Sequence, residues 1–167
     1  MRLTSGLSRV IEILYVRHSR KIVGTTRSLP QGRTRSFIAS NIRLGCLDWN
    51  EGGRRRTKCR VTLKWADSEV NCVDWNFFES FKQVRQQLVS LSLYPICYGA
   101  SRNIVITGMA IDMSLGMKIY KGVKLNTFPT RNQLVSLFDS GDDVEPVSVE
   151  EQVEFQREWV KSVRTQV

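Results

Sequence analysis

The feature that most constrains the fold is a stretch of apolar–polar alternation over residues 60–72. Apolar side chains occupy every second position on both sides of Asp67-Ser68. With these two residues as a turn, Trp65 pairs with Val70 and one face of the resulting hairpin is apolar. A half-buried antiparallel pair requires this pattern. A slip of one residue would bury Lys64, so we expect the face of each strand to be firmly specified.

An amphipathic helix is predicted directly after the hairpin. Asn76, with Glu79 three residues later, is typical of a helix start, and Pro95 ends the helical pattern. One set of residues recurs at helical spacing and is expected to face the core, while a second set is expected on the solvent face. The core set is Phe77, Phe81, Val84, Leu88 and Leu91, and the solvent set is Lys82, Gln83, Arg85 and Gln86.

Shorter elements are predicted between this helix and the C-terminus. The runs 96–98 and 117–120 have strand character, and residues 99–103 are expected to form a tight polar turn. Two capping patterns, Thr130 with Gln133 and Ser148 with Glu151, each predict a helix. The first helix would hold Leu134, Val135, Leu137 and Phe138, and the second would present Val149, Val153, Phe155, Trp159, Val160 and Val163.

These elements predict a single α+β domain over residues 50–165. It would have a short antiparallel sheet packed by one long central helix and a C-terminal helix. Residues 1–46 carry nine Arg or Lys and one acidic residue, and Gly and Pro interrupt any regular period. We interpret them as a basic, poorly ordered N-terminal extension that folding does not require. The alternative is a basic arm that contacts phosphates.

Charge is distributed unevenly along the 167 residues, whose net charge is +9. Residues 1–70 contribute +10, residues 71–130 contribute +3, and residues 131–167 contribute −4. A basic N-terminal region and an acidic C-terminal region favour binding to different partners, or to each other. No run of 18 apolar residues and no signal-peptide core is present, so we expect a cytoplasmic protein without membrane contact.

Metal and cofactor sites are disfavoured by the residues available. The four cysteines form no C-x-x-C pair, and the single histidine, His18, lies far from them in sequence. Free thiols in a reducing cytoplasm are the expected state. The loop 139–146 carries four acidic residues, but their spacing does not match a calcium-binding loop. We therefore expect no metal and no cofactor.

Catalysis is also disfavoured. Ser101 would need a base to act as a nucleophile, and His18 belongs to the least patterned segment of the chain. Gly99, Gly108 and Gly116 are spaced too widely for a phosphate-binding loop. We expect a protein that is not an enzyme. Two roles stay open for Arg102: an ion pair with Asp112 that stabilises the fold, or a contact with a partner.

The second half of the chain contains a distinctive set of motifs. They are Cys97-Tyr98-Gly99-Ala100-Ser101-Arg102-Asn103, Gly108-Met109, Gly116-Met117-Lys118 with Tyr120, Leu134-Val135, Phe138-Asp139, Asp143-Val144-Glu145-Pro146-Val147-Ser148-Val149-Glu150-Glu151-Gln152 and Trp159. On these residues, about residues 57–165 of the chain resemble an uncharacterised family of small bacterial proteins. That family has Pro-Ser where this chain has Ile106-Thr107, and Met-Gly where it has Met113-Ser114. Its members resemble the immunity proteins that accompany bacterial polymorphic toxins of the Rhs type.

Three functions are compatible with these observations. The first is a small cytosolic protein-binding domain, and the resemblance implies an immunity protein that neutralises a toxin. The others are a basic nucleic-acid-binding module and a protein that has retained no activity. The residues expected to bind a protein partner are Tyr98, Ser101, Arg102, Asn103, Asp142, Asp143 and Glu145, and those expected to bind nucleic acid are Arg33, Arg35, Arg54, Arg55 and Arg56.

Overall fold

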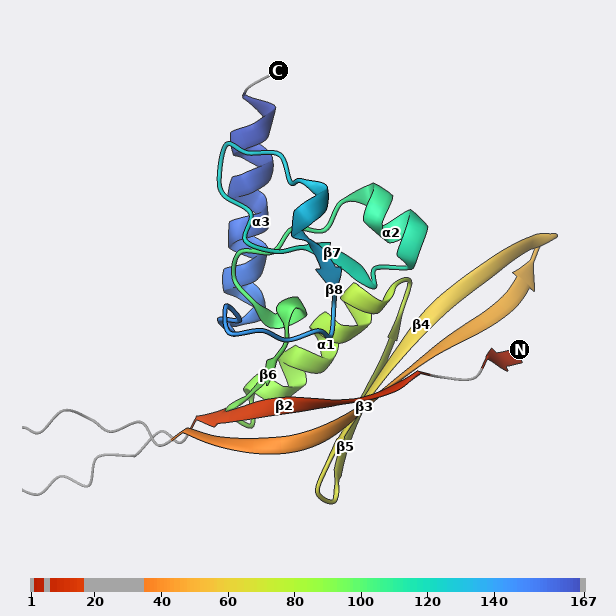
Figure 1. Ribbon diagram of the computed structural model, residues 1–167. Helices are drawn as coiled ribbons and strands as arrows, with labels where there is room; N and C mark the ends of the chain where they lie inside the picture. Colours follow the sequence, from red (N-terminus) through yellow and green to blue (C-terminus); the bar gives the residue numbers. More distant parts are fainter. Residues whose placement is uncertain (1, 5–6, 17–34, 166–167) are drawn as a thin grey trace, which may run out of the picture.

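The computed structural model describes residues 2–4, 7–16 and 35–165, and its largest element is a six-stranded antiparallel sheet (Figure 1). Its strands are β1 (Arg2–Thr4), β2 (Ser8–Val16), β3 (Arg35–Glu51), β4 (Arg54–Trp65), β5 (Ser68–Asp74) and β6 (Leu93–Ile96). The strand order is β5-β4-β3-β2-β6, and β1 also pairs with β3. The β3–β4 hairpin projects away from the helices.

Strands β2 and β3 correct the interpretation of residues 1–46 as an extension. β2 lies between β3 and β6, and β3 runs without a break through the domain boundary expected near residue 50. Ile11 and Ile13 of β2 are buried in the main core together with Ile42 and Leu44 of β3. Polar residues such as Ser40 and Asn41 break the apolar alternation of β3, and adjacent apolar residues in β2 give no clear period of two, so the sequence did not reveal these strands. Residues 17–34 lie outside the described part of the chain.

The predicted hairpin is present with a register shifted by two residues. Ala66 and Asp67 form the loop, so Trp65 pairs with Ser68 and Leu63 with Val70. Ala66 adopts a φ of 45°, which a two-residue hairpin loop requires at its first position. Side chains alternate with a period of two, so a two-residue shift leaves the predicted apolar face intact.

Helix α1 (Phe77–Val89) packs against the apolar face of the sheet. The predicted cap is confirmed, because the Asn76 side chain accepts a hydrogen bond from the Glu79 N–H at 2.9 Å. Four of the five predicted core residues are buried, but Leu91 lies beyond the helix and is 51% exposed. Arg85, predicted on the solvent face, is only 2% exposed, so that prediction was wrong. The C-terminal part of the chain covers this side of α1.

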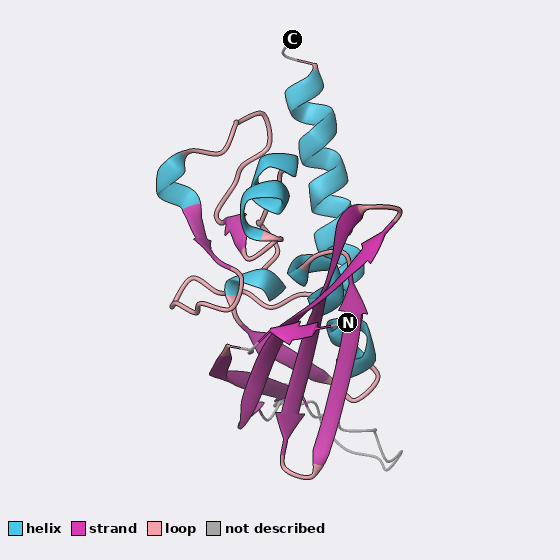
Figure 2. Ribbon diagram, turned by 90° about the vertical axis from the view of Figure 1, so that its right-hand side faces the viewer, coloured by secondary structure: helices cyan, strands magenta, loops and turns pink. Residues whose placement is uncertain are grey.

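That C-terminal part consists of short elements around a second, two-stranded sheet (Figure 2). The predicted strand at 117–120 is confirmed as β7, whereas the helix predicted for residues 134–138 is wrong. Pairing with β7 satisfies the backbone of residues 134–136 and overrides their local helical pattern. The elements are η1 (Tyr98–Ala100), α2 (Gly108–Ser114), β7 (Lys118–Tyr120), η2 (Arg131–Gln133), β8 (Leu134–Ser136) and α3 (Val149–Arg164).

Helix α3 closes the C-terminal part. The Ser148 side chain accepts a hydrogen bond from the Glu151 N–H at 3.1 Å, which confirms the predicted cap. Trp159 and Val163 form a second small core with Val105 and Val123. Together, the antiparallel sheet and the helices confirm the predicted α+β class.

Candidate functional site

A hollow of about 140 Å³ brings together six of the seven residues predicted to bind a protein partner. One wall comes from η1 and the segment after it, and the other comes from the loop before α3. Backbone contacts join the two walls, since the Val147 N–H donates to Ala100 O at 3.0 Å. The six are Tyr98, Ser101, Arg102, Asn103, Asp143 and Glu145, whereas Asp142 lies outside the lining.

A polar cluster occupies the floor of this hollow. The Tyr98 hydroxyl donates to Asp143 Oδ1 at 2.7 Å, and Lys121 Nζ donates to the Tyr98 hydroxyl oxygen at 2.7 Å. Lys121 Nζ also donates to Asp143 Oδ2 at 2.9 Å and lies 4.3 Å from the centre of the Tyr98 ring. Sequence reasoning missed Lys121, because a single lysine after a short strand belongs to no motif.

Both charged members of the cluster are held in their ionised forms. The hydrogen bond with Tyr98, followed by that with Asp143, raises the pKa of Lys121. The hydrogen bonds from Lys121 and then Tyr98 lower the pKa of Asp143. Tyr98 therefore has its only hydroxyl proton committed to a carboxylate. The cluster is a preorganised charged surface rather than an available nucleophile.

Gly141 allows the acidic loop to approach Tyr98 this closely. A Cβ atom at residue 141 would lie 2.2 Å from the Tyr98 hydroxyl oxygen, far inside van der Waals contact. By comparison, a Cβ atom at Gly108 would meet no atom within 4 Å. The glycine at 141 is therefore needed for the geometry of the hollow, and not only for a turn.

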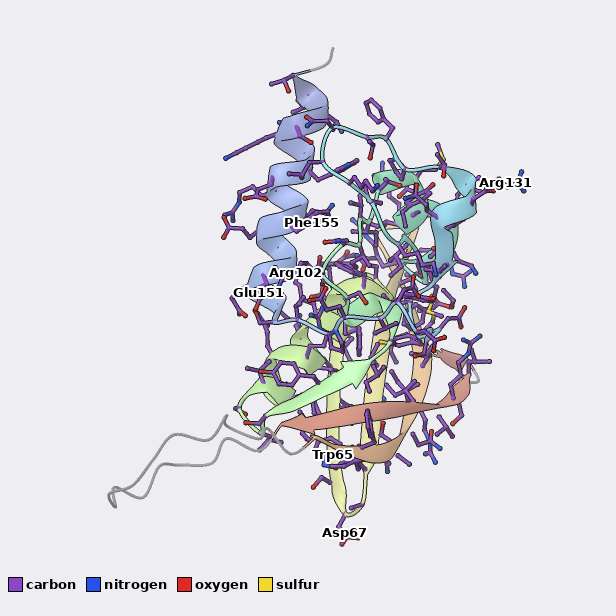
Figure 3. All side chains as sticks on the ribbon, turned by 60° about the vertical axis from the view of Figure 1, so that its left-hand side comes forward. Trp65, Asp67, Arg102, Arg131, Glu151 and Phe155 are labelled. Atoms are coloured by element: carbon purple, nitrogen blue, oxygen red, sulfur yellow. The ribbon has the colours of Figure 1, made fainter. Side chains whose placement is uncertain are left out.

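Arg102 forms an ion pair with Glu151 of α3 rather than with Asp112 (Figure 3). Its Nη2 lies 2.7 Å from Glu151 Oε2, and the two side chains are 47% and 49% exposed. The expected alternative, a pair with Asp112, is thus wrong. An exposed pair of this kind contributes little to stability, about 0–1 kcal/mol. Arg102 can therefore turn toward a partner at small energetic cost.

A buried polar network fixes the wall from which Arg102 projects. The Arg85 guanidinium donates to Gly99 O at 3.0 Å, to Val147 O at 2.8 Å and to Gln152 Oε1 at 2.6 Å. Gln152 Nε2 in turn donates to Gly99 O and Ser101 O. Burial lowers the pKa of Arg85 to about 10, so the group is still charged at neutral pH. One helical Arg thus joins α1, η1 and α3.

The surface beside the hollow is strongly acidic. Residues 139–158 contain eight acidic residues and one basic residue, and all eight carboxylate side chains are exposed. Four of them belong to the loop and four to α3. Three of the eight are in ion pairs, Asp139 with Arg9, Asp143 with Lys121 and Glu151 with Arg102, and the other five form no ion pair with a described residue.

The residues predicted to bind nucleic acid do not form one patch. Because side chains alternate along β4, Arg54 and Arg56 lie on one face of the hairpin and Arg55 on the other. Arg55 Nη2 lies 2.7 Å from Asp48 Oδ2, and Arg56 Nε lies 3.3 Å from Glu51 Oε2. Arg33 and the side chain of Arg35 lie outside the described part of the structure.

Other candidate chemistry is limited in the described part of the chain. No disulfide joins the four cysteines in the described part of the chain. Burial raises the pKa of Cys97 to about 12 and, with the nearby Cys46, that of Cys59 to about 12. No group of three or more His, Cys, Asp or Glu residues there is placed to hold a metal ion. No helix there has both the length and the apolar character that crossing a membrane would require.

No protein-family model and no curated protein matches this chain.

Proposed function

We propose that this chain is a small cytosolic, non-enzymatic protein-binding domain that engages its partner with the hollow and the acidic surface around it. The observation that carries the proposal is the convergence of residues 98–103 and 143–145 on one hollow beside eight exposed carboxylates. Tyr and Arg are enriched among the residues that dominate interface energies, and this hollow contains both.

The chemistry of the surface favours a basic partner. A dense negative field accelerates association with a positively charged domain and fixes its orientation. The buried Arg85–Gln152 network supports a rigid wall, so the partner would meet a preformed surface. A nuclease toxin is basic because it must bind nucleic acid. The sharper form of the proposal is thus an immunity protein that covers such a toxin.

The proposal predicts a toxin gene immediately upstream of this chain. The test uses the toxin domain of that gene, purified in an inactive form, with affinity measured by calorimetry and association rates by stopped flow. The Asp142→Asn/Glu145→Gln double variant should weaken binding at least about tenfold, mainly through a slower and less salt-dependent association. Asp67→Asn/Glu69→Gln removes the same charge at the β4–β5 loop and is the matched control. It should leave the affinity within about twofold.

Two results would contradict the proposal. One is an equal affinity of Asp142→Asn/Glu145→Gln and of the control double variant for the toxin domain, since the acidic surface would then not be the contact site. The other is the absence of a toxic neighbour together with no binding to any co-encoded basic domain. Arg102→Ala adds a second readout, because it should weaken binding while lowering stability by no more than about 1 kcal/mol.

A further inference from the structure

No described helix packs on the face of the sheet opposite α1 (Figure 2). Cys59, Val61 and Leu63 of β4 point into the core, so the residues between them point to the opposite side. We call the side of β3, β4 and β5 that faces away from α1 the outer sheet face. At its centre lies Gly45, where an added Cβ atom would meet no atom within 4 Å.

Basic side chains dominate the outer sheet face. Among its described side chains, six basic residues stand against two acidic ones, Glu51 and Glu69. Both acids are already engaged, Glu51 with Arg56 and Glu69 with Lys64. The basic residues are Arg43, Arg54, Arg56, Lys58, Arg60 and Lys64.

Four of these cations form no ion pair with any described residue: Arg43, Arg54, Lys58 and Arg60. Arg60 Nε is buried and has no hydrogen-bond partner in the described structure. Lys58, Arg60 and Lys64 lie on one face of β4, and the spacing between them along the strand is a multiple of about 7 Å. The result is a row of cations with unused hydrogen-bond donors.

Two tryptophan rings stand at one end of this row, one partly buried and one exposed. Trp49 and Trp75 lie with their ring centres 6.2 Å apart, tilted by 38°. Lys58 Nζ lies 4.9 Å from the Trp75 ring centre. Trp75 is 57% exposed. An indole of this exposure beside cations offers a stacking platform next to positive charge.

We propose that the outer sheet face binds single-stranded nucleic acid. The cations Arg43, Lys58 and Arg60 contact phosphates, and Trp75 stacks on an unpaired base. A positively charged track with an aromatic platform is how proteins bind single strands without strong sequence preference. A duplex offers the same phosphates but keeps its bases stacked internally, so it would not use Trp75. This surface lies apart from the acidic one, and the inference does not depend on the proposed function.

The test measures binding of fluorescently labelled oligothymidylate and oligouridylate to the full-length protein by fluorescence anisotropy. Arg43→Glu/Lys58→Glu should weaken binding at least about tenfold. Lys124→Glu/Arg164→Glu is the control, since it makes the same charge change at exposed residues elsewhere and should change affinity about twofold or less. Trp75→Ala should weaken binding about fivefold or more, the range expected for one stacked base.

Salt dependence gives a second readout. Three phosphate contacts on a single strand predict a linear plot of log affinity against log salt concentration, with a slope of about −2. The slope should become shallower by about one unit or more in Arg43→Glu/Lys58→Glu and should not change in Trp75→Ala. Thermal unfolding checks each variant, and Lys58→Gln, which removes the charge but keeps a polar side chain, replaces the double variant if that one unfolds.

Three results would overturn the inference. Equal weakening by the sheet variants and the control variants would indicate a general attraction of polyanions. Duplex binding that equals single-strand binding, with no effect of Trp75→Ala, would exclude base stacking. Tighter binding to phosphatidylserine-containing vesicles than to either oligonucleotide, abolished by the sheet variants, would assign the face to a membrane surface.

Discussion

The two charged surfaces of this protein are built in different ways. The outer sheet face rests on regular strand geometry, because alternation along β4 places its cations on one side and antiparallel pairing adds Arg43 of β3 beside them. The acidic hollow depends on contacts between residues far apart in sequence, above all those of Arg85 with Gly99, Val147 and Gln152. A surface built by local alternation should tolerate substitution, whereas one built by a buried network should not.

The largest expected effect concerns β2 and β3, the strands that were not predicted from the sequence. Deleting residues 1–46 removes β2 and most of β3, and with them the buried Ile11, Ile13, Ile42 and Leu44. We expect the truncated chain to lose its cooperative unfolding transition, because β4 and α1 would lose their packing partners. Calorimetry of the truncated and full-length chains measures this. A preserved transition would mean that the C-terminal elements fold without the sheet.

The next effect concerns the contact between the two regions. Phe81 of α1 packs edge-on against Phe138, which follows β8, with ring centres 4.9 Å apart. Phe81→Ala should lower the free energy of unfolding by about 3–5 kcal/mol, since it empties an aromatic core site. Denaturant titration tests this. The exposed Phe128→Ala serves as the control and should change stability by less than about 0.5 kcal/mol.

A smaller effect distinguishes the acidic hollow, which depends on a buried network, from the outer sheet face, which does not. Gln152→Leu leaves the Arg85 charge without its side-chain acceptor, and should lower the free energy of unfolding by about 2–3 kcal/mol. Gln86→Leu on the exposed side of α1 is the matched control, expected within about 0.5 kcal/mol. Partner binding should fall with Gln152→Leu, while binding of oligonucleotides by the outer sheet face should not. Equal loss of both would show that the surfaces are not built independently.

The smallest effect is the pH dependence of the Tyr98–Lys121–Asp143 cluster. The pKa of Asp143 is lowered from 3.8 in the folded state, so its stabilisation is present above about pH 4 and is lost as the pH falls further. The pKa of Lys121 is raised from 10.5, so its stabilisation is present below that pH and is lost as the pH rises through the folded value. The stability difference between the parent and Lys121→Met should therefore be constant near neutrality and shrink at both extremes. A difference that does not change with pH would exclude a charged pair.

Local patterns in the sequence identified the elements that depend on neighbours in the chain. The Asn76 and Ser148 caps, the face of the β4–β5 hairpin and the β7 strand all rest on residues a few positions apart. Alternation on β4 likewise determines which of its cations share a face. These features follow from the sequence because backbone geometry, with periods of 2.0 and 3.6, decides them.

The tertiary structure decided everything that joins distant segments. Arg85 reads as a solvent-facing residue by helical period, yet it is buried because η1 and α3 surround that side of α1. Lys121 reaches the hollow only through the path of the chain after β7, and residues 134–136 become a strand only because β7 lies beside them. In each case the long-range contact outweighs a local preference of a few tenths of a kcal/mol, about the size of most helix propensities.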